Sequence, residues 1–154
     1  MSEPRASRAG FPGYGMTTDT DGMLPWSWAV ERLAVAHNYW IATASPDGGP
    51  HAMPVWGLWR GDAFVFNTGA TSRKARNLAA DPRVVVHLES GDEVVVLEGV
   101  VDRVDATIEL VDEYDAKYAF RTEVGSSWYR VRPGRAYAWR ERDFPQSATR
   151  FDFG

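Results

Sequence analysis

The sequence predicts a mainly β protein of the α+β class, an antiparallel β-barrel of six to seven strands with two to three helices. Most apolar runs are short and are separated by turns containing Gly, Pro or Asp, as in antiparallel sheets. Two runs, Val84–Val86 and Val94–Leu97, have consecutive apolar residues, which indicates strands covered on both faces. A barrel interior would cover one face, and helices or a second copy of the chain the other. We therefore expect a homodimer; a sandwich with helices over one sheet is the alternative.

The chain of 154 residues is expected to form one domain preceded by a flexible lead. Residues 1–22 are rich in Gly, Ser, Thr and Pro and have no periodic apolar pattern, so we assign the folded domain to residues 23–154. A helix is expected from Pro25, because proline suits a first helical turn. The apolar residues that follow recur with the helical period: Trp26, Ala29, Val30 and Leu33.

From Tyr39 onward the pattern changes to that of strands. Gly61-Asp62 predicts a hairpin turn, and Pro133-Gly134-Arg135 predicts a turn between two late strands. A second long helix is expected over residues 105–120, where Asp105 can act as the N-cap. The expected strands are residues 39–44, 51–59, 63–68, 83–89, 94–104, 127–132, 136–140 and 149–153.

A short basic helix follows the strand of residues 63–68 and is the most informative feature of the chain. The loop Gly69–Thr71 opens the helix Ser72–Leu78, which Asp81-Pro82 ends. Hydroxyls, unpaired backbone N–H groups and cations meet at this helix N-terminus, and that combination binds phosphate. A capped surface helix with solvated cations is the alternative, but the flanking strands favour a phosphorylated small molecule.

Composition and motifs exclude several other classes of function. The net charge of −4 argues against nucleic acid as a partner, and the absence of cysteine excludes thiolate chemistry. The three histidines lack metal-ligand spacing, so no metal site is expected. No apolar run reaches the ~18 residues of a membrane helix, and no signal peptide is evident, so we expect a cytoplasmic protein without a membrane partner.

In order and spacing, six segments resemble the flavin-binding split-barrel proteins, the pyridoxamine 5′-phosphate oxidase-like family. The resemblance extends from about Pro25 to the end of the chain, and it implies an FMN-binding split β-barrel homodimer with two cofactor sites at the subunit interface. The chain is most similar to the branch that uses the deazaflavin coenzyme F420, whereas other members hold FMN. The segments are Trp40–Thr43, Gly49–Trp56, Phe66–Thr68, Ser72–Leu78, Asp81–Val84 and Ala148–Phe153.

The resemblance also implies which residues bind the cofactor. Those expected at its phosphate are Thr71, Ser72, Arg73, Lys74 and, one turn further on, Asn77. Those expected along its ring are His51, Met53, Pro54, Val55, Trp56, Asn67 and Thr68. Proline within a strand indicates an edge, where a freed backbone group can meet the ring. An aromatic residue from the region of Trp139 is expected to reach the cofactor of the partner subunit, although a packed core residue is the alternative.

No side chain stands out as a general acid or base, as expected where a cofactor supplies the chemistry. We therefore expect an F420-dependent reductase that transfers a hydride to an unsaturated small organic substrate. One alternative is an FMN-binding flavoprotein like pyridoxamine 5′-phosphate oxidase. Another is a protein that binds a flavin or deazaflavin without catalysis.

Overall fold

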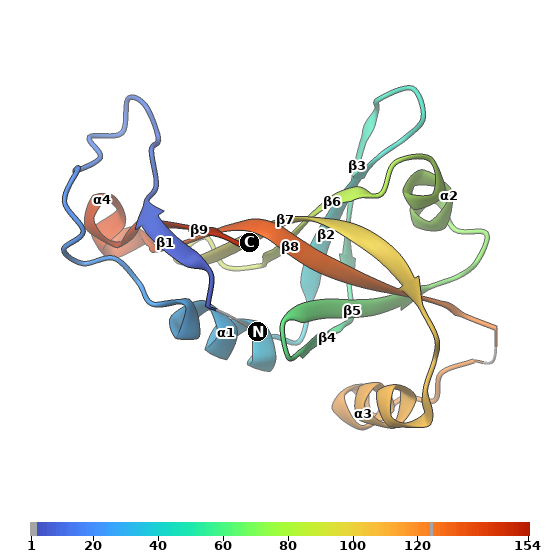
Figure 1. Ribbon diagram of the computed structural model, residues 1–154. Coiled ribbons are helices and arrows are strands. Elements are labelled where there is room, and N and C mark those ends of the chain that lie inside the picture. Colours follow the sequence, from blue (N-terminus) through green and yellow to red (C-terminus); the bar gives the residue numbers. More distant parts are fainter. Residues whose placement is uncertain (1–2, 124) are drawn as a thin grey trace.

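The computed structural model describes residues 3–123 and 125–154 and confirms a mainly β fold (Figure 1). All strand pairs are antiparallel and belong to one sheet. The strands are β1 Arg5–Arg8, β2 Tyr39–Ala44, β3 Pro50–Val55, β4 Leu58–Arg60, β5 Ala63–Thr68, β6 Arg83–Leu88, β7 Glu93–Val104, β8 Ser127–Arg140 and β9 Thr149–Asp152. The helices are α1 Trp26–Val35, α2 Arg73–Ala80, α3 Ile108–Tyr118 and α4 Phe144–Ser147, with a 3-10 turn at Glu141–Asp143.

The sheet divides along β8. The order of strands is β1-β9-β8-β7-β6-β2-β3, and β5 also pairs with β8 while β4 pairs with β5. The first half of β8 therefore lies beside β5 and its second half beside β9, with β7 along the other side. Among the described residues, β3 pairs with β2 alone, so its other edge is free and the barrel is open there.

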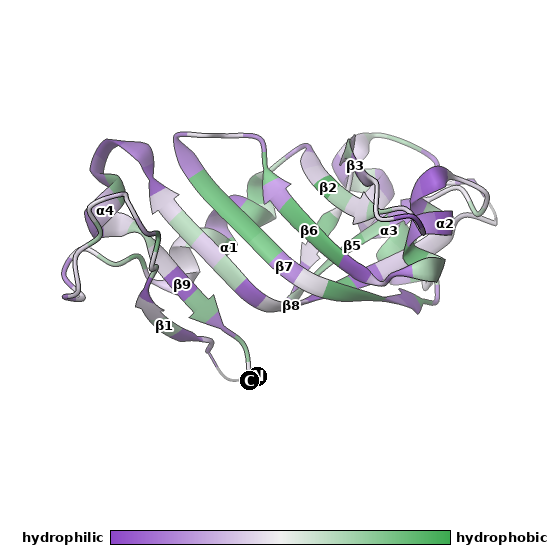
Figure 2. Ribbon diagram, turned by 90° about the horizontal axis from the view of Figure 1, so that it is seen from above, coloured by the Kyte–Doolittle hydropathy of each residue, from purple (hydrophilic) through white to green (hydrophobic). Residues whose placement is uncertain are grey.

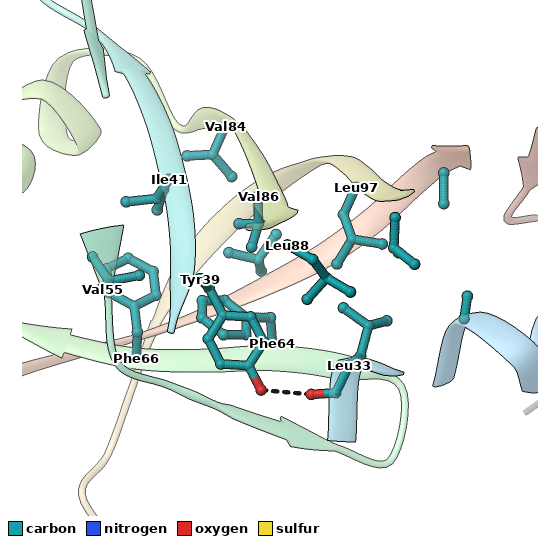
Figure 3. Close-up of a cluster of buried hydrophobic side chains, with 14 of the residues drawn as sticks. Leu33, Tyr39, Ile41, Val55, Phe64, Phe66, Val84, Val86, Leu88 and Leu97 are labelled. Carbon is teal, nitrogen blue, oxygen red and sulfur yellow. Dashed lines mark hydrogen bonds between the residues drawn. The ribbon is translucent and has the colours of Figure 1, made fainter. Parts of the chain in front are cut away.

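The main core lies inside this curved sheet and is rich in aromatic rings. Figure 3 shows Tyr39, Phe64 and Phe66 packed among aliphatic side chains from β2, β6 and β7, and the hydroxyl of Tyr39 donates to the carbonyl of Leu33 (2.5 Å). A second cluster lies under α3, where Tyr114 and Tyr118 pack against Leu58, Val65 and Trp128. Strand β5 therefore buries side chains on both of its faces, which explains its unbroken apolar run.

Three of the four described α-helices lie toward the two ends of the molecule, and α1 lies between them against the sheet (Figures 1 and 2). Figures 1 and 2 both show α2 and α3 at one end, and β1, β9 and α4 at the other. Figure 2 also shows long hydrophobic stretches along β6 and β7. In the single chain Val100 stays 46% exposed, and Val85 is only partly buried. No described helix is long and apolar enough to cross a bilayer.

Three expected strands have different boundaries in the structure. The expected strand of residues 51–59 is interrupted at Trp56 and Gly57, so that β3 pairs with β2 and only β4 forms the hairpin with β5. The expected turn at Pro133-Gly134-Arg135 is instead the middle of the continuous strand β8. Glu98 of β7 pairs with Arg135, and the next residue, Gly99, pairs with Pro133. Gly134 of β8 is therefore an extra residue without a partner in β7, as in a β-bulge.

The segment expected to be a flexible lead contains an element of the sheet. Strand β1 pairs with β9, and the guanidinium of Arg8 donates to the backbone carbonyls of Asp19 (3.0 Å), Asp21 (2.8 Å), Pro145 (3.1 Å) and Ala148 (3.2 Å). These bonds hold parts of the segment against the C-terminal region. They need no apolar periodicity in the segment, so a sequence pattern does not indicate them. Helix α4 was also not expected, and α3 begins after Thr107, whose hydroxyl accepts from Leu110, rather than after Asp105.

Candidate functional site

Several residues predicted to bind a cofactor meet in one cleft of about 370 Å³ at the α2–α3 end of the molecule. Three elements supply them: the end of β3, the end of β5 and the first turn of α2. The predicted residues that line the cleft are Pro54, Val55, Trp56, Asn67, Thr68 and Lys74. Asn38 and Tyr114 also line it and were not predicted. The sequence signal that could have indicated Tyr114 is its spacing from Tyr118 on an otherwise acidic helix, because residues one turn apart lie on the same helix face.

Helix α2 begins where the sequence places it, because Ser72 caps it. The hydroxyl of Ser72 accepts from the amide of Ala75 (3.1 Å) and shares a hydrogen bond with the hydroxyl of Thr68 (2.9 Å). The second bond ties the end of β5 to the start of α2. The amides of Arg73 and Lys74 lie in the first turn, where a helix has no carbonyl of its own to pair them. The cap therefore fixes the N-terminus of α2, the positive end of its helix dipole, beside the cleft.

Two cations, Arg73 and Lys74, lie at this end of the cleft. Among the described residues Arg73 and Lys74 form no ion pair, whereas Arg83, Arg130 and Arg140 each pair with an aspartate. Lys74 is partly buried, and this burial lowers the pKa of its amine. Arg73 and Thr71 are exposed at the rim. An anion reaching this corner would meet the charges of Arg73 and Lys74, although Arg73 also acts on the carboxylate of Asp47 and helps to lower its pKa.

His51 lies next to these cations with part of its ring unpaired. Its Nδ1 atom is buried and has no hydrogen-bond partner among the described residues. Burial of the ring lowers its pKa, and the charges of Arg73 and Lys74 lower it further. His51 therefore lies within reach of the charges of the cationic corner, and its contact with the ring stays a prediction.

The opposite wall of the cleft is the free edge of β3. Pro54 pairs with Trp40 of β2 and faces no further strand, as the proline predicts. Met53 on the same strand is 45% exposed. Trp56 follows the end of β3, and its ring stacks on that of Tyr118, with centroids 4.4 Å apart and planes 8° apart. Pro54, Val55 and Trp56 give this wall apolar side chains, while Asn38, Asn67 and Thr68 add polar groups to the cleft.

Two of the predicted residues that do not line the cleft, Asn77 and Trp139, make other contacts instead. Asn77 is 2% exposed, and its amide donates to the hydroxyl of Thr43 (3.0 Å), so it joins α2 to β2 instead of facing a ligand. Trp139 lies at the other end of β8, packed against Phe11 and Phe144, and lines a separate cavity of about 520 Å³. The contact of Trp139 with a cofactor of the partner subunit stays a prediction.

The cleft can hold a planar molecule with an anionic tail. A phosphate would meet the start of α2, Lys74 and Arg73, and a ring would lie along Pro54–Trp56 with its polar edge near Asn67 and Thr68. No cluster of carboxylates or histidines among the described residues could bind a metal ion there. Tyr114, whose pKa is raised to about 12 chiefly by burial, keeps its proton and can donate a hydrogen bond.

The chain is similar to known proteins in both sequence and fold. The chain is 34% identical over 134 residues to a pyridoxine/pyridoxamine 5′-phosphate oxidase of Sphingopyxis alaskensis, covering 81% of this chain and 61% of the relative. It therefore spans about three fifths of the length of that relative. A solved F420 reductase is 25% identical, with a TM-score of 0.59, covering 69% of this chain and 94% of that one. A conserved hypothetical protein from Mycobacterium tuberculosis shares the fold, with a TM-score of 0.71 at 23% identity, covering 82% of this chain and 91% of that one.

The family assignment rests on most of the folded chain. The model of the pyridoxamine 5′-phosphate oxidase family matches residues 29–143, which include β2 to β8 and every residue that lines the cleft. The chain belongs to the pyridoxamine 5′-phosphate oxidase family.

Proposed function

We propose that the chain is an oxidoreductase that binds the deazaflavin coenzyme F420 in this cleft and uses its reduced form to reduce an unsaturated small organic substrate. The observation that carries the proposal is that one cleft joins a cationic helix start to the free edge of a proline-containing strand. The first feature suits a phosphate, and the second suits a flat ring.

The residues at the cationic corner fit the phosphate of either candidate cofactor. Lys74 and Arg73 would form charge-assisted hydrogen bonds with it, and the amides at the start of α2 would complete its shell. Ser72 has a supporting role, because its hydroxyl already caps the helix and bonds to Thr68. The buried and unpaired Nδ1 of His51 is a further group that an anion here could engage.

The residues of the β3 edge would orient the ring. Backbone groups near Pro54 would meet its polar edge, and Trp56 would limit how far it slides toward α3. When bound in reduced form, F420 supplies a hydride. The protein would then position the acceptor on the open face of the ring and exclude water. The hydroxyl of Tyr114, or water near it, would provide the proton.

The solved F420 reductase supports this choice of cofactor, because the shared fold accounts for nearly all of that chain. We also expect the cofactor sites to lie at the interface of a homodimer. The partly buried Val85 and the exposed Val100 leave apolar surface on the sheet for a second copy to cover. Native mass spectrometry of the purified chain would test the dimer.

FMN is the second candidate, because the oxidase of S. alaskensis has the higher sequence identity, 34%. The corner at α2 fits the FMN phosphate equally well. The sequence shows no second phosphate cradle for a phosphorylated vitamin B6 substrate, so oxidation of such a substrate is less favoured than flavin binding itself.

Binding and turnover assays distinguish these candidates. Titration of the protein into F420 should quench or shift the fluorescence of the coenzyme with micromolar affinity, and a panel of quinones and enones should then oxidise the reduced coenzyme. Protein that is yellow as purified, from a retained flavin, and that does not bind F420 would favour FMN. Binding of F420 with no turnover of any acceptor would favour a carrier. Absence of F420 binding up to millimolar concentration would exclude the proposal.

A further inference from the structure

The corner between β3 and β4 is held by the last turn of α3. The ammonium of Lys117 donates to the carbonyl of Gly57 (2.8 Å) and to the hydroxyl of Tyr39 (3.1 Å). The hydroxyl of Tyr118 accepts from the amide of Gly57 (2.9 Å) and lies within bonding distance of the carbonyls of Gly57 (2.9 Å) and His37 (2.8 Å). Both backbone groups of Gly57 are therefore bound by side chains of one helix.

These contacts fix Trp56, the residue before Gly57. Its ring lies on the ring of Tyr118 and is met at its edge by Phe120, with centroids 5.6 Å apart and planes at 78°. A side chain at position 57 would collide with the ring of Phe64, so the backbone has no room to shift inward. Because Trp56 lines the cleft, the position of that wall depends on the hydrogen bonds from α3 to Gly57.

Lys117 is an unusual residue to find at the centre of such a network. The chain has seventeen basic residues, and only Lys74 and Lys117 are lysines. The hydrogen-bond acceptors of Lys117 are neutral, and its ammonium lies 4.9 Å from the ring centroid of Tyr39 and 5.1 Å from that of Tyr118. Unlike arginine, lysine can lose its proton when it is partly buried.

The charged and titratable groups around Lys117 are few. Glu113, one turn earlier on α3, is the nearby carboxylate, and it pairs with Arg60 of β4 (2.9 Å). Tyr39 of β2 and Tyr118 of α3 face the amine directly, and His37, between α1 and β2, contacts the ring of Tyr118 at 5.1 Å. Burial outweighs the carboxylate and lowers the pKa of Lys117 to about 8.

We propose that Lys117 is a positioning residue for the cleft: through Gly57 and Tyr118 it holds Trp56 in the ring-binding wall, and its protonation controls how firmly. The proposal rests on the proposed function only in taking the Trp56 wall as the place of the ring. The packed corner holds the neutral amine more readily than the ammonium, because the ammonium loses hydration where it is partly buried and regains it when the corner opens. Gain of the proton therefore loosens Trp56, and ring affinity rises as the pH increases from 7 to 9.

The first test needs no cofactor. Near-ultraviolet circular dichroism of the purified protein, followed from pH 6.5 to 9.5, should show a transition near pH 8. The transition should be absent in Trp56→Phe, which removes the reporting ring, and in Lys117→Met. It should be retained in His37→Gln, which removes the imidazole ring that contacts Tyr118. A transition that is unchanged in Lys117→Met, or the absence of any transition in the parent, would overturn the proposal.

The second test measures ring binding with FMN and F420 as probes. The parent should bind about 3- to 10-fold more tightly at pH 9 than at pH 7. Lys117→Arg, which keeps a cation at both pH values, should show no such gain. Lys117→Met, which has no donor for the carbonyl of Gly57, should be weak at both. Equal pH dependence in the parent and Lys117→Arg would contradict the proposal, and a failure of all proteins to bind either probe would count against the proposed function while the spectroscopic test still decides the role of Lys117.

Discussion

The two ends of the candidate cleft use the two lysines of the chain in opposite ways. At the α2 end, Lys74 lines the cleft with no ion pair among the described residues, so its charge is available to a ligand. At the α3 end, Lys117 is turned inward and its hydrogen bonds go to Gly57 and Tyr39. One lysine is placed to bind and the other to position. Substitutions at the two ends should therefore produce different kinds of defect.

The largest effect on ligand binding is expected at the α2 end. Lys74→Ala should weaken FMN or F420 binding by roughly 1.5–3 kcal/mol, about 10- to 150-fold, because a charge-assisted contact to phosphate is lost. Riboflavin, which has no phosphate, should bind parent and variant alike. Arg76→Ala is the matched control, since Arg76 is an exposed cation two residues further along the same helix. Equal losses in the two variants would mean that general charge, not this corner, attracts the ligand.

The largest effect on stability is expected at the α3 end. In Gly57→Ala the added methyl group would overlap the ring of Phe64 and lie 2.9 Å from the carbonyl oxygen of Val65. Overpacking of this kind costs about 1–3 kcal/mol of unfolding free energy. Gly69→Ala, near the α2 end, is the control, because a methyl group there meets no atom within 4 Å. Urea denaturation measures the unfolding free energy of both variants. A Gly57→Ala protein as stable as the control would show that the chain around Gly57 can shift to accommodate the methyl group.

A moderate effect on the pH dependence of stability should come from Lys117. Its pKa is lowered to about 8 in the folded chain, whereas an unfolded lysine has a pKa of about 10.4. The unfolded state therefore binds more protons between these values, and this lysine contributes stability that is complete above the higher value and lost as the pH falls through about 8. The unfolding free energy of the parent should rise relative to Lys117→Met from pH 7 to 9.5. If the unfolding free energies of the two proteins changed in parallel with pH, the pKa of Lys117 would not be lowered in the folded chain.

The smallest effect is expected from His51. An anion at the α2 corner would offset the charges of Arg73 and Lys74, which now help to lower the pKa of the imidazole. Binding should therefore raise that pKa and take up a proton, so FMN affinity should increase a few-fold as the pH falls from 8 to 6. His51→Gln should flatten this dependence, as isothermal titration calorimetry in two buffers would show. A profile unchanged by the substitution would place the anion away from His51.

What the sequence could predict differs between the two ends for a physical reason. The α2 end depends on local signals: Ser72 caps the helix that follows it, and Pro54 forfeits a ladder hydrogen bond wherever it lies in a strand. The α3 end depends on contacts between residues about sixty positions apart, such as Gly57 with Lys117 and Tyr118. No local pattern indicates that these contacts interrupt the strand at Trp56.

The same distinction explains the other differences. The Pro133-Gly134 pair is a strong turn signal, but pairing with β7 and β9 keeps β8 extended through it. Strand β1 is short and polar, and the bonds from Arg8 to distant carbonyls were not predictable from its own residues. Asn77 looked accessible on a basic helix, although its amide is used by Thr43 of β2. In each case a tertiary contact overrode a correct local tendency.

A crystal structure of the protein soaked with FMN or F420 tests the central claim most directly. We expect the phosphate beside Lys74 at the start of α2, and the ring along Pro54–Trp56 with its polar edge toward Asn67. A phosphate found elsewhere, or a ring seated in the aromatic cavity beside Trp139 of the same subunit with the cleft empty, would contradict the account.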